Sequence, residues 1–375
     1  MVVAAATSMF TVFGIAYSFG AFFESMSADF GTGAGPTALV FSVTLSLSFV
    51  LAPITGRYTD RFGPRPVLWV GAASLAAGLL LTTVAPSIVV AYITYGVGVG
   101  VAVACGYVPM VSTVGGWFVR QRAAALGVAV AGVGVGTLVG APLAAALIGG
   151  IGWRATFVVF AVGGASLMVL AGLVAERGPA AAEAVRLRPL GELLRIRAFG
   201  LLYGASLLVT FGLFVPFVFI VSYAEGRGVG EVAAATLVGV IGGASIIGRL
   251  GLGTLAVRFG VTRLFRLSFL VMGLSHLIWL VAGDRYALLV LYAVVLGVGY
   301  GGFIAIAPAV VADRFGLEGM GGILGTLYTS AAVGSLLGPP LAGLLFDELG
   351  DATAIAAAAA VSLAGWSVLL LLDSD

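Results

Sequence analysis

Residues 242–263 read Gly-Gly-Ala-Ser-Ile-Ile-Gly-Arg-Leu-Gly-Leu-Gly-Thr-Leu-Ala-Val-Arg-Phe-Gly-Val-Thr-Arg. This stretch begins within a long apolar run, ends in a short basic loop, and places Arg249 well inside the apolar run. A guanidinium stays protonated in proteins, so in a low-dielectric position it needs a polar or anionic partner. The stretch therefore predicts a membrane-spanning helix whose arginine binds a carboxylate.

The composition of the whole chain supports a membrane location. Of its 375 residues, 61% are hydrophobic and 9% are charged, with a mean hydropathy of +1.18, whereas soluble domains carry about 25% charged residues. We therefore predict an all-α polytopic membrane protein. The single Cys105 excludes an intrachain disulfide and argues against a cysteine metal site. The net charge of +2 gives no reason to expect nucleic-acid binding.

Apolar runs of about 20 residues, the length that crosses a bilayer, recur along the chain. The first lacks the basic region and cleavage site of a secretory signal, so we read it as a retained span. The twelve predicted spans are residues 2–24, 36–56, 66–85, 87–115, 122–148, 153–175, 199–224, 231–256, 262–282, 286–311, 319–346 and 350–372.

The arginines predict the orientation of these spans. All 18 basic residues are arginine, and with both termini in the cytoplasm fourteen lie in cytoplasmic loops. Three lie outside, namely Arg154, Arg227 and Arg285, and Arg249 is the remaining one. Cytoplasmic loops are enriched in basic residues, so this bias predicts an even number of spans in the cytoplasmic membrane, with both termini cytoplasmic.

The two halves of the chain repeat each other. Residues 56–63 align with residues 253–260 at an offset of 197, and Pro142 aligns with Pro339 at the same offset. The longest polar interval separates the repeats, and parallel six-span repeats place a binding site between them near the middle of the membrane. We predict an N-terminal half at 1–175, a cytoplasmic linker at 176–198 and a C-terminal half at 199–375.

The loop after the second span reads Gly56-Arg-Tyr-Thr-Asp-Arg-Phe-Gly-Pro-Arg65. It resembles the signature of the major facilitator superfamily, Gly-x-x-x-Asp-Arg-x-Gly-x-Arg, at all five defined positions. The resemblance implies a transporter with twelve transmembrane helices in two six-helix halves. Other segments resemble the branch that contains monocarboxylate transporters and oxalate–formate antiporters: Tyr17-Ser-Phe-Gly20, Trp117-Phe118 with Arg122, Gly152-Trp-Arg154 and Gly325-Thr-Leu-Tyr328.

The resemblance gives Arg249 a role. In that branch an arginine of the eighth span binds the substrate carboxylate, nine residues before the basic residue of the degenerate second signature. Arg249 stands nine residues before Arg258, and at about 1.5 Å per residue it lies roughly 13 Å from the cytoplasmic loop, near the middle of a ~30 Å core. The alternative is that its side chain extends to the cytoplasmic interface.

Three departures from that branch limit the inference. Ser245 stands where animal proton-coupled members carry an Asp four residues before the arginine. Residues 20–23 lack the lysine of the first span, and the residues after Tyr328 lack the lysine of oxalate exchangers. With one cavity cation left, the resemblance favours a monocarboxylate and leaves both proton-linked transport and anion exchange open.

Four tyrosines fall in spans that line the cavity in this superfamily. A phenol offers an apolar face and a hydrogen-bond donor, which suits a small carboxylate with a short tail; ordinary helix packing is the alternative for each. Gly242, Ser245 and Ile246 share the helix face of Arg249 and are expected to leave room for a ligand, and family members place contacts around Cys105. The predicted substrate-binding residues are Arg249, Tyr107, Tyr328, Tyr17, Tyr300, Cys105 and Ser245.

The signature loop predicts a gate. The resemblance implies that Asp60 faces the amides that begin the eleventh span, near residues 319–322, where a helix N-terminus favours a carboxylate. Arginines of the loop would then bind nearby carboxylates, unless they only set the topology. Val257 replaces the aspartate in the second copy, which predicts a weaker mirrored contact. The predicted gating residues are Asp60, Arg61, Arg65, Gly56, Gly63 and Asp313.

Two other features predict structure. Gly132, Gly136 and Gly140 form a smooth ridge that suits a sliding surface between the halves. His276, the only histidine, falls in the ninth span, where we expect a structural role. The sequence shows no Ser-His-Asp set, metal-ligand cluster or phosphate-binding loop, so we predict no cofactor and no enzyme activity.

The resulting hypothesis is a secondary active transporter, a monomer in the lipid bilayer, that moves small organic monocarboxylate anions such as lactate, pyruvate or formate by alternating access. Protons are the partner if transport is proton-linked. An exporter of drugs or other small hydrophobic solutes, and an oxalate/formate-type exchanger, are the alternative transporters; drug carriers usually place an acid in the cavity. A non-transporting sensor or scaffold is the remaining alternative.

Overall fold

Lipid offers no hydrogen bonds to main-chain groups, so spanning segments must satisfy them internally, and every regular element that we describe is a helix. The computed structural model describes residues 1–118, 122–177, 190–316 and 320–373, without the side chains of 122–124, 253–254, 257, 320–321 and 373. Most of the predicted linker, and residue 319 of the predicted eleventh span, lie outside these residues.

The helices follow the predicted division into halves. The N-terminal half holds α1 (Val2–Tyr17), α2 (Phe19–Phe30), α3 (Ala34–Phe62), α4 (Pro64–Thr82), α5 (Ile88–Ala91), the π-helix η1 (Tyr92–Val97), α6 (Gly98–Gly106), α7 (Val108–Trp117) and α8 (Arg122–Val174). After the short α9 (Leu190–Leu193), the C-terminal half holds α10 (Arg197–Leu213), α11 (Val215–Glu225), α12 (Glu231–Phe259), α13 (Val261–Ala282), α14 (Tyr286–Phe315), α15 (Met320–Leu349), α16 (Asp351–Leu370) and the 3-10 helix η2 (Leu371–Asp373).

The described helices confirm the predicted fold class. Eleven stretches are long and apolar enough to cross a membrane. One of them contains two helices, because Gly152 within α8 has φ 78° and ψ 161°, a conformation that only glycine adopts readily. This break falls between the predicted spans 122–148 and 153–175, so the described residues form twelve spans.

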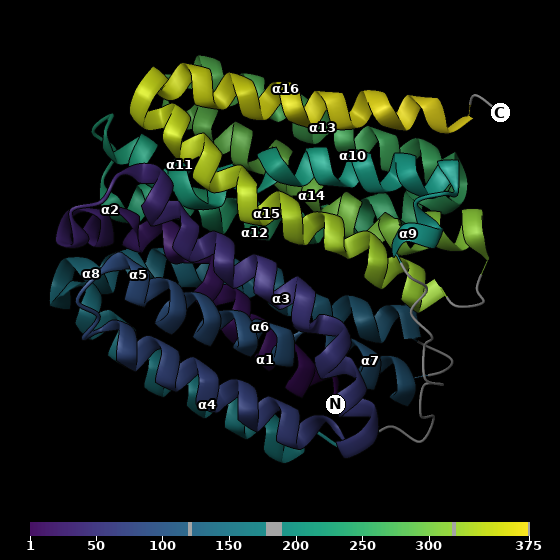
Figure 1. The fold of residues 1–375 in the computed structure, drawn as a ribbon, viewed down its shortest axis with the longest axis horizontal. Coiled ribbons are helices and arrows are strands. Elements are labelled where there is room, and N and C mark those ends of the chain that lie inside the picture. Colours follow the sequence, from purple (N-terminus) through teal and green to yellow (C-terminus); the bar gives the residue numbers. More distant parts are fainter. Residues whose placement is uncertain (119–121, 178–189, 317–319, 374–375) are drawn as a thin grey trace.

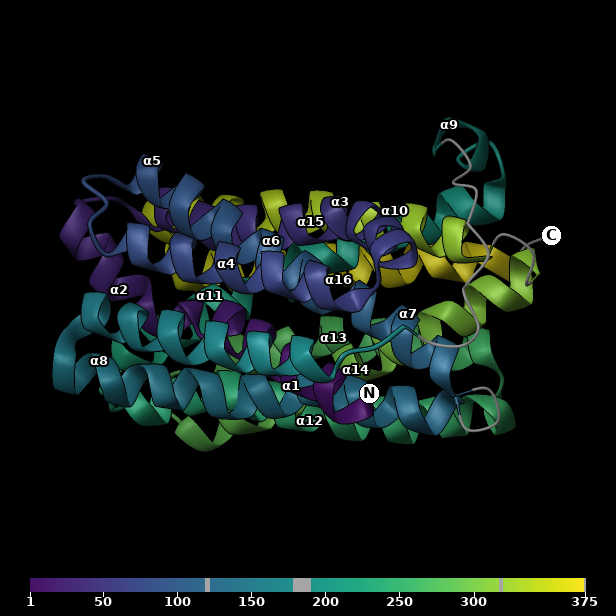
Figure 2. The same ribbon diagram turned by 90° about the horizontal axis from the view of Figure 1, so that it is seen from below.

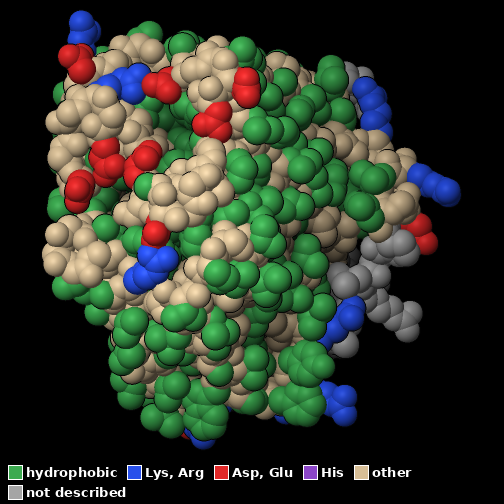
Figure 3. Space-filling view, turned by 60° about the vertical axis from the view of Figure 1, so that its left-hand side comes forward, with side chains coloured by type: hydrophobic (Ala, Val, Ile, Leu, Met, Phe, Trp, Pro, Cys, Tyr) green, Lys and Arg blue, Asp and Glu red, His purple; other side chains and the backbone are tan. Residues whose placement is uncertain are grey.

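The spans run side by side as two bundles, purple to blue for the N-terminal half and green to yellow for the C-terminal half (Figures 1 and 2). Across the halves, α3 packs on α15 and α8 packs on α12. We call the end with α9 and the C-terminus the linker end, and the opposite end, with α2 and the bend of α8, the outer end. Figure 3 turns the outer end toward the viewer and shows carboxylates gathered on it, beside flanks covered by hydrophobic side chains.

The glycine ridge of α8 packs inside its own half. A Cβ at Gly132, Gly136 or Gly140 would meet the main chain of α1. The prediction that this ridge is a sliding surface between the halves is therefore wrong. Gly134, at another register of α8, contacts α12 instead, where a Cβ would lie 2.7 Å from the carbonyl oxygen of Gly242. Sequence spacing identifies a smooth helix face but does not tell which neighbour fills it.

The first span of each half is broken at an equivalent place. The breaks lie at Ser18, between α1 and α2, and at Phe214, between α10 and α11. They are 196 residues apart, close to the repeat offset of 197. Pro216 accounts for the second break because proline has no amide hydrogen for the carbonyl four residues earlier. Beyond the breaks, α2 and α11 pack against each other at the outer end.

Candidate functional site

Arg249 lies on α12 at the interface between the halves. Its Nη1 donates a hydrogen bond of 2.9 Å to the carbonyl oxygen of Val130 on α8. The side chain is partly buried, and Nε is buried with no hydrogen-bond partner among the described residues. The guanidinium thus points across the interface, and the alternative that it extends to the end of its helix does not describe this structure.

The charge of Arg249 has no counter-ion among the residues described. The ion pairs recorded there join Arg154 to Asp29 and Arg227 to Asp351, both at the outer end. A guanidinium carries five N–H donors, and one neutral carbonyl does not compensate a charge taken out of water. The site is therefore suited to an anion that brings both negative charge and hydrogen-bond acceptors.

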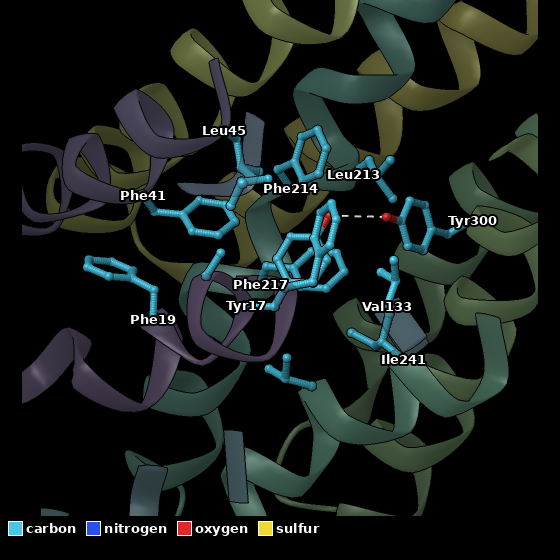
Figure 4. Packing of buried hydrophobic residues seen from close by; sticks show 14 of the residues in the cluster. Tyr17, Phe19, Phe41, Leu45, Val133, Leu213, Phe214, Phe217, Ile241 and Tyr300 are labelled. Carbon is cyan, nitrogen blue, oxygen red and sulfur yellow. Dashed lines mark hydrogen bonds between the residues drawn. The ribbon is translucent and has the colours of Figure 1, made fainter. Parts of the chain in front are cut away.

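Two tyrosines from opposite halves meet above this guanidinium. The Arg249 Cζ lies 5.7 Å from the ring centroid of Tyr300 on α14. The hydroxyl of Tyr300 is 3.1 Å from the hydroxyl of Tyr17, the last residue of α1 (Figure 4). This pair links the C-terminal half to the N-terminal half directly over the cationic site, and both side chains are buried.

Tyr107 and Tyr328 complete the group. Both interact electrostatically with Arg249, and the ring of Tyr107 packs edge-on against Phe13 at 5.3 Å between centroids. Tyr107 stands at the junction of α6 and α7, where Pro109 removes a helical donor. The structure thus brings together Arg249 and all four predicted tyrosines from five spans, although their role in binding stays a prediction.

Cys105 and Ser245 are not brought into this group. The Cβ of Cys105 lies 2.8 Å from the place where a Cβ on Gly71 would sit, so its side chain packs on α4. Ser245 is fully buried and its hydroxyl donates to the carbonyl oxygen of Gly242 at 2.7 Å. Gly242 itself packs against Thr137 of α8. The small residues near Arg249 therefore serve helix packing more than they provide room.

Phe217 on α11, which sequence reasoning missed, covers the group on its outer side. Its ring centroid lies 4.5 Å from that of Tyr17 and 6.0 Å from that of Tyr300. Gly20 occupies the equivalent repeat position, 197 residues earlier, and a Cβ there would lie 2.8 Å from the carbonyl oxygen of Phe217. The repeat could have identified Phe217, whereas the Val130 carbonyl leaves no signal because every residue carries one.

Asp347, near the end of α15, joins the halves at the outer end. Its Oδ2 accepts a hydrogen bond of 2.8 Å from the amide of Ala34, which begins α3 and has no acceptor in its own helix. Gly33 precedes it, and a Cβ there would lie 2.7 Å from the same carboxylate oxygen. The helix dipole and free amides favour a carboxylate at this position, so Asp347 caps a helix of the other half.

The signature loop lies at the linker end. Asp60 is exposed and interacts electrostatically with Arg177. Of its predicted partners, residue 319 and the side chains of 320–321 lie outside the description, as does the side chain of Val257, so the gating role of Asp60 stays a prediction. Gly63 ends α3 with φ 85°, a left-handed conformation that favours glycine.

The arginines of the loop have partners other than those predicted. Arg65 donates from Nε and Nη2 to the carbonyl oxygens of Gly172 and Leu173, at 3.1 and 3.0 Å, and so caps the last turn of α8 in its own half. Arg61 lies over the ring of the adjacent Phe62. Neither makes an ion pair with Asp313 in the described structure, because α8 offers unpaired carbonyls closer by. Asp313 lines a cleft with arginines of the C-terminal half.

Comparisons with known proteins agree with this architecture. A model of the Major Facilitator Superfamily matches residues 4–275 and 252–375. Monocarboxylate transporter 3 of Rattus norvegicus is 33% identical over 91% of this chain and 73% of its own length. Monocarboxylate transporter 11 of Homo sapiens is 31% identical over 93% and 78%, and monocarboxylate transporter 13 of Rattus norvegicus is 30% identical over 96% and 85%.

Proposed function

The chain belongs to the major facilitator superfamily and is related within it to the monocarboxylate transporters, and from this premise we propose that it carries a small organic monocarboxylate across the cytoplasmic membrane by alternating access. The observation that supports this most is the buried Nε of Arg249, without a partner among the described residues, on a guanidinium between the halves. The substrate carboxylate takes the place of the missing acceptor.

The surroundings of Arg249 favour a short substrate with one charge. One guanidinium balances one carboxylate, and the nearby rings of Phe13, Tyr107 and Tyr300 offer apolar faces to a tail of a few carbons. The tyrosine hydroxyls can bond a second polar group, such as the hydroxyl of lactate or the keto oxygen of pyruvate. An oxalate-type exchanger would have to balance a second negative charge, for which the described group holds no further cation.

The closed outer end supports an inward-facing state. In it, α2 packs on α11 and Asp347 caps α3 beyond the tyrosine pair. At the linker end, Ile54, Tyr58 and Phe62 of α3 are 46%, 56% and 54% exposed. With the linker end in the cytoplasm, as the arginine bias predicts, a monomer would release substrate inward and rock its halves to face outward.

The decisive test is transport by Arg249→Ala in proteoliposomes loaded with purified protein. Removing one partner of a buried charge pair costs about 3–5 kcal/mol, so we expect uptake of labelled lactate or pyruvate to fall by at least about 100-fold. Arg285→Ala, an exposed arginine outside the bundle interior, is the matched control and should transport normally. Uptake by Arg249→Ala at the wild-type rate would contradict the assignment.

Competition and gradients refine the substrate and the coupling. Lactate, pyruvate and formate should compete for uptake, while oxalate and a hydrophobic amine should not; inhibition by the amine alone would favour a drug exporter. An inside-alkaline pH gradient should accelerate net uptake if a proton accompanies the substrate. Acceleration only by a preloaded carboxylate would identify anion exchange.

A further inference from the structure

His276 on α13 has unusual partners for a residue inside a bundle. It is fully buried, and each ring nitrogen contacts a main-chain carbonyl oxygen. Nδ1 lies 2.8 Å from the oxygen of Met272 in its own helix, and Nε2 lies 3.3 Å from the oxygen of Gly212 on α10. The rings of Trp279 and Tyr292 pack beside the imidazole and limit its rotation.

The carbonyl of Gly212 is the one that Pro216 deprives of its helical donor. In an α-helix this oxygen would accept the amide hydrogen of residue 216, but proline has none. The helix α10 ends one residue after Gly212, and the amide of Phe214 contacts the same oxygen from only two residues away. A buried carbonyl without an adequate donor is costly, and His276 supplies a donor from a neighbouring helix.

The break in the first span has the same design, which is an independent observation. There the carbonyl oxygen of Ile15 accepts the hydroxyl of Ser18 at 2.8 Å. It also receives the hydroxyl of Tyr95, from η1 of the same half, at 3.4 Å. In both halves, therefore, a side chain from another helix of that half reaches the carbonyl at the break.

The break in the seventh span sets the direction of α11 and thus the seat of Phe217. Figure 4 shows Leu213, Phe214 and Phe217 in the cluster that surrounds Tyr17 and Tyr300. A small change of direction at Phe214 would displace Phe217, whose carbonyl and ring contact Gly20 and Tyr17 of the other half.

We propose that His276 is a positioning residue of the outer closure: its hydrogen bond to the Gly212 carbonyl, which Pro216 leaves without a helical donor, holds the bend that seats Phe217 on Tyr17. The histidine acts through the main chain of α10 and does not touch the substrate. Its effect on transport rests on the proposed function, but its effect on the outer closure does not.

The test is a labelling experiment that needs no substrate. Cys105→Ala with Val221→Cys places one thiol on α11 at its contact with Gly20, where Val221 is buried. Purified protein in lipid nanodiscs is treated with a polar maleimide. His276→Met, which removes the donor at similar size, should raise the labelling rate about tenfold, as expected for a buried carbonyl left unpaired. His276→Gln, which keeps an amide donor, should change it much less.

Pro216→Ala supplies the critical control because it returns the missing amide. In the Pro216→Ala background, His276→Met should change labelling by less than about twofold. An equal increase in both backgrounds, or no increase with Pro216 present, would overturn the proposal. If His276→Met alone fails to fold, recovery of folded protein by Pro216→Ala supports the proposal and failure to recover overturns it.

Transport provides a separate readout. His276→Met should lower the maximal lactate uptake rate several-fold and leave KM nearly unchanged, because the residues around Arg249 are intact; a rise in KM with an unchanged maximal rate would count against a positioning role. If the wild type transports no carboxylate while the labelling results hold, the proposed function fails and the inference about His276 stands.

Discussion

The two ends of the α3–α15 pair differ although each offers the same contact partners. At the outer end, Asp347 near the end of α15 accepts the amide of Ala34 at the start of α3. At the linker end, Asp60 near the end of α3 is exposed and bonds no described residue, its recorded interaction being electrostatic with Arg177. Each antiparallel helix thus ends in an aspartate that can cap the start of the other.

Packing differs in the same sense. At the outer end, a Cβ on Gly35 would lie 3.1 Å from the carbonyl oxygen of Pro340, so the two helices touch through their main chains. At the linker end, a Cβ on Gly56 would meet only Val108 of its own half, at 3.8 Å. Because rigid halves that rock about a central site cannot close both ends together, one aspartate contact should form as the other breaks.

The largest expected effect would break the closed end outright. Gly20→Leu places a side chain where the carbonyl of Phe217 now lies, and overpacking of this kind costs about 1–3 kcal/mol. In the Cys105→Ala, Val221→Cys background we expect maleimide labelling to rise by up to about 100-fold. Gly163→Leu, at a glycine with open space around it, should label like the parent. Equal labelling of all three would mean that Gly20 does not hold the outer end shut.

Asp347→Asn tests the contact that joins the outer end. The variant loses a charge-assisted hydrogen bond to a helix N-terminus, so the outward-facing population should grow by about fivefold. Spin labels at Thr32 and Leu349, measured by double electron–electron resonance, should report more of the longer distance. Glu348→Gln changes the neighbouring charge and should leave the distribution as in the parent, and an identical response of both variants would show that only net charge matters.

Asp60→Asn sharpens the comparison through its sign. Its predicted contact is absent from the state described, so its loss should favour this state by about threefold and shorten the mean distance between the same labels. Combined with Asp347→Asn, the two shifts should largely cancel. Displacement in one direction by both single variants would refute the reciprocal design.

Tyr17→Phe gives the smallest expected effect and tests the inner border of the closed end. It removes the hydroxyl that meets Tyr300, and a net hydrogen bond is worth about 1 kcal/mol, so KM for lactate should rise about threefold to fivefold. Tyr292→Phe removes a buried hydroxyl that has no partner in the described structure and should transport normally. A larger effect of Tyr292→Phe than of Tyr17→Phe would reverse the assignment.

Local patterns allowed much of this architecture to be predicted. Hydropathy reported the spans because each must be apolar over its own length, and the 197-residue offset reported the halves because each repeats the same backbone path. The breaks at Ser18 and Phe214 obey that offset as well. Arg249 stood out because a charge in an apolar run has few structural explanations.

Other elements could not be predicted, for physical reasons. The partner of the Gly132 ridge depends on which helix docks there, and it is α1 and not the other half. The Val130 carbonyl that holds Arg249 carries no side-chain signal. Cys105 and Tyr107 are two residues apart, yet only Tyr107 reaches the site, since the junction of α6 and α7 turns one residue inward and leaves the other on α4.

The sequence by itself determined the membrane location, the twelve spans, the two halves and the cation between them, because these follow from hydropathy, repetition and charge along a single chain. Only the tertiary structure decided which groups meet that cation and which end is shut. Those contacts join residues hundreds of positions apart, such as Tyr17 with Tyr300 and Ala34 with Asp347. Distances between such residues depend on how two rigid bundles dock, and that docking has more than one solution in a protein that must open to both sides.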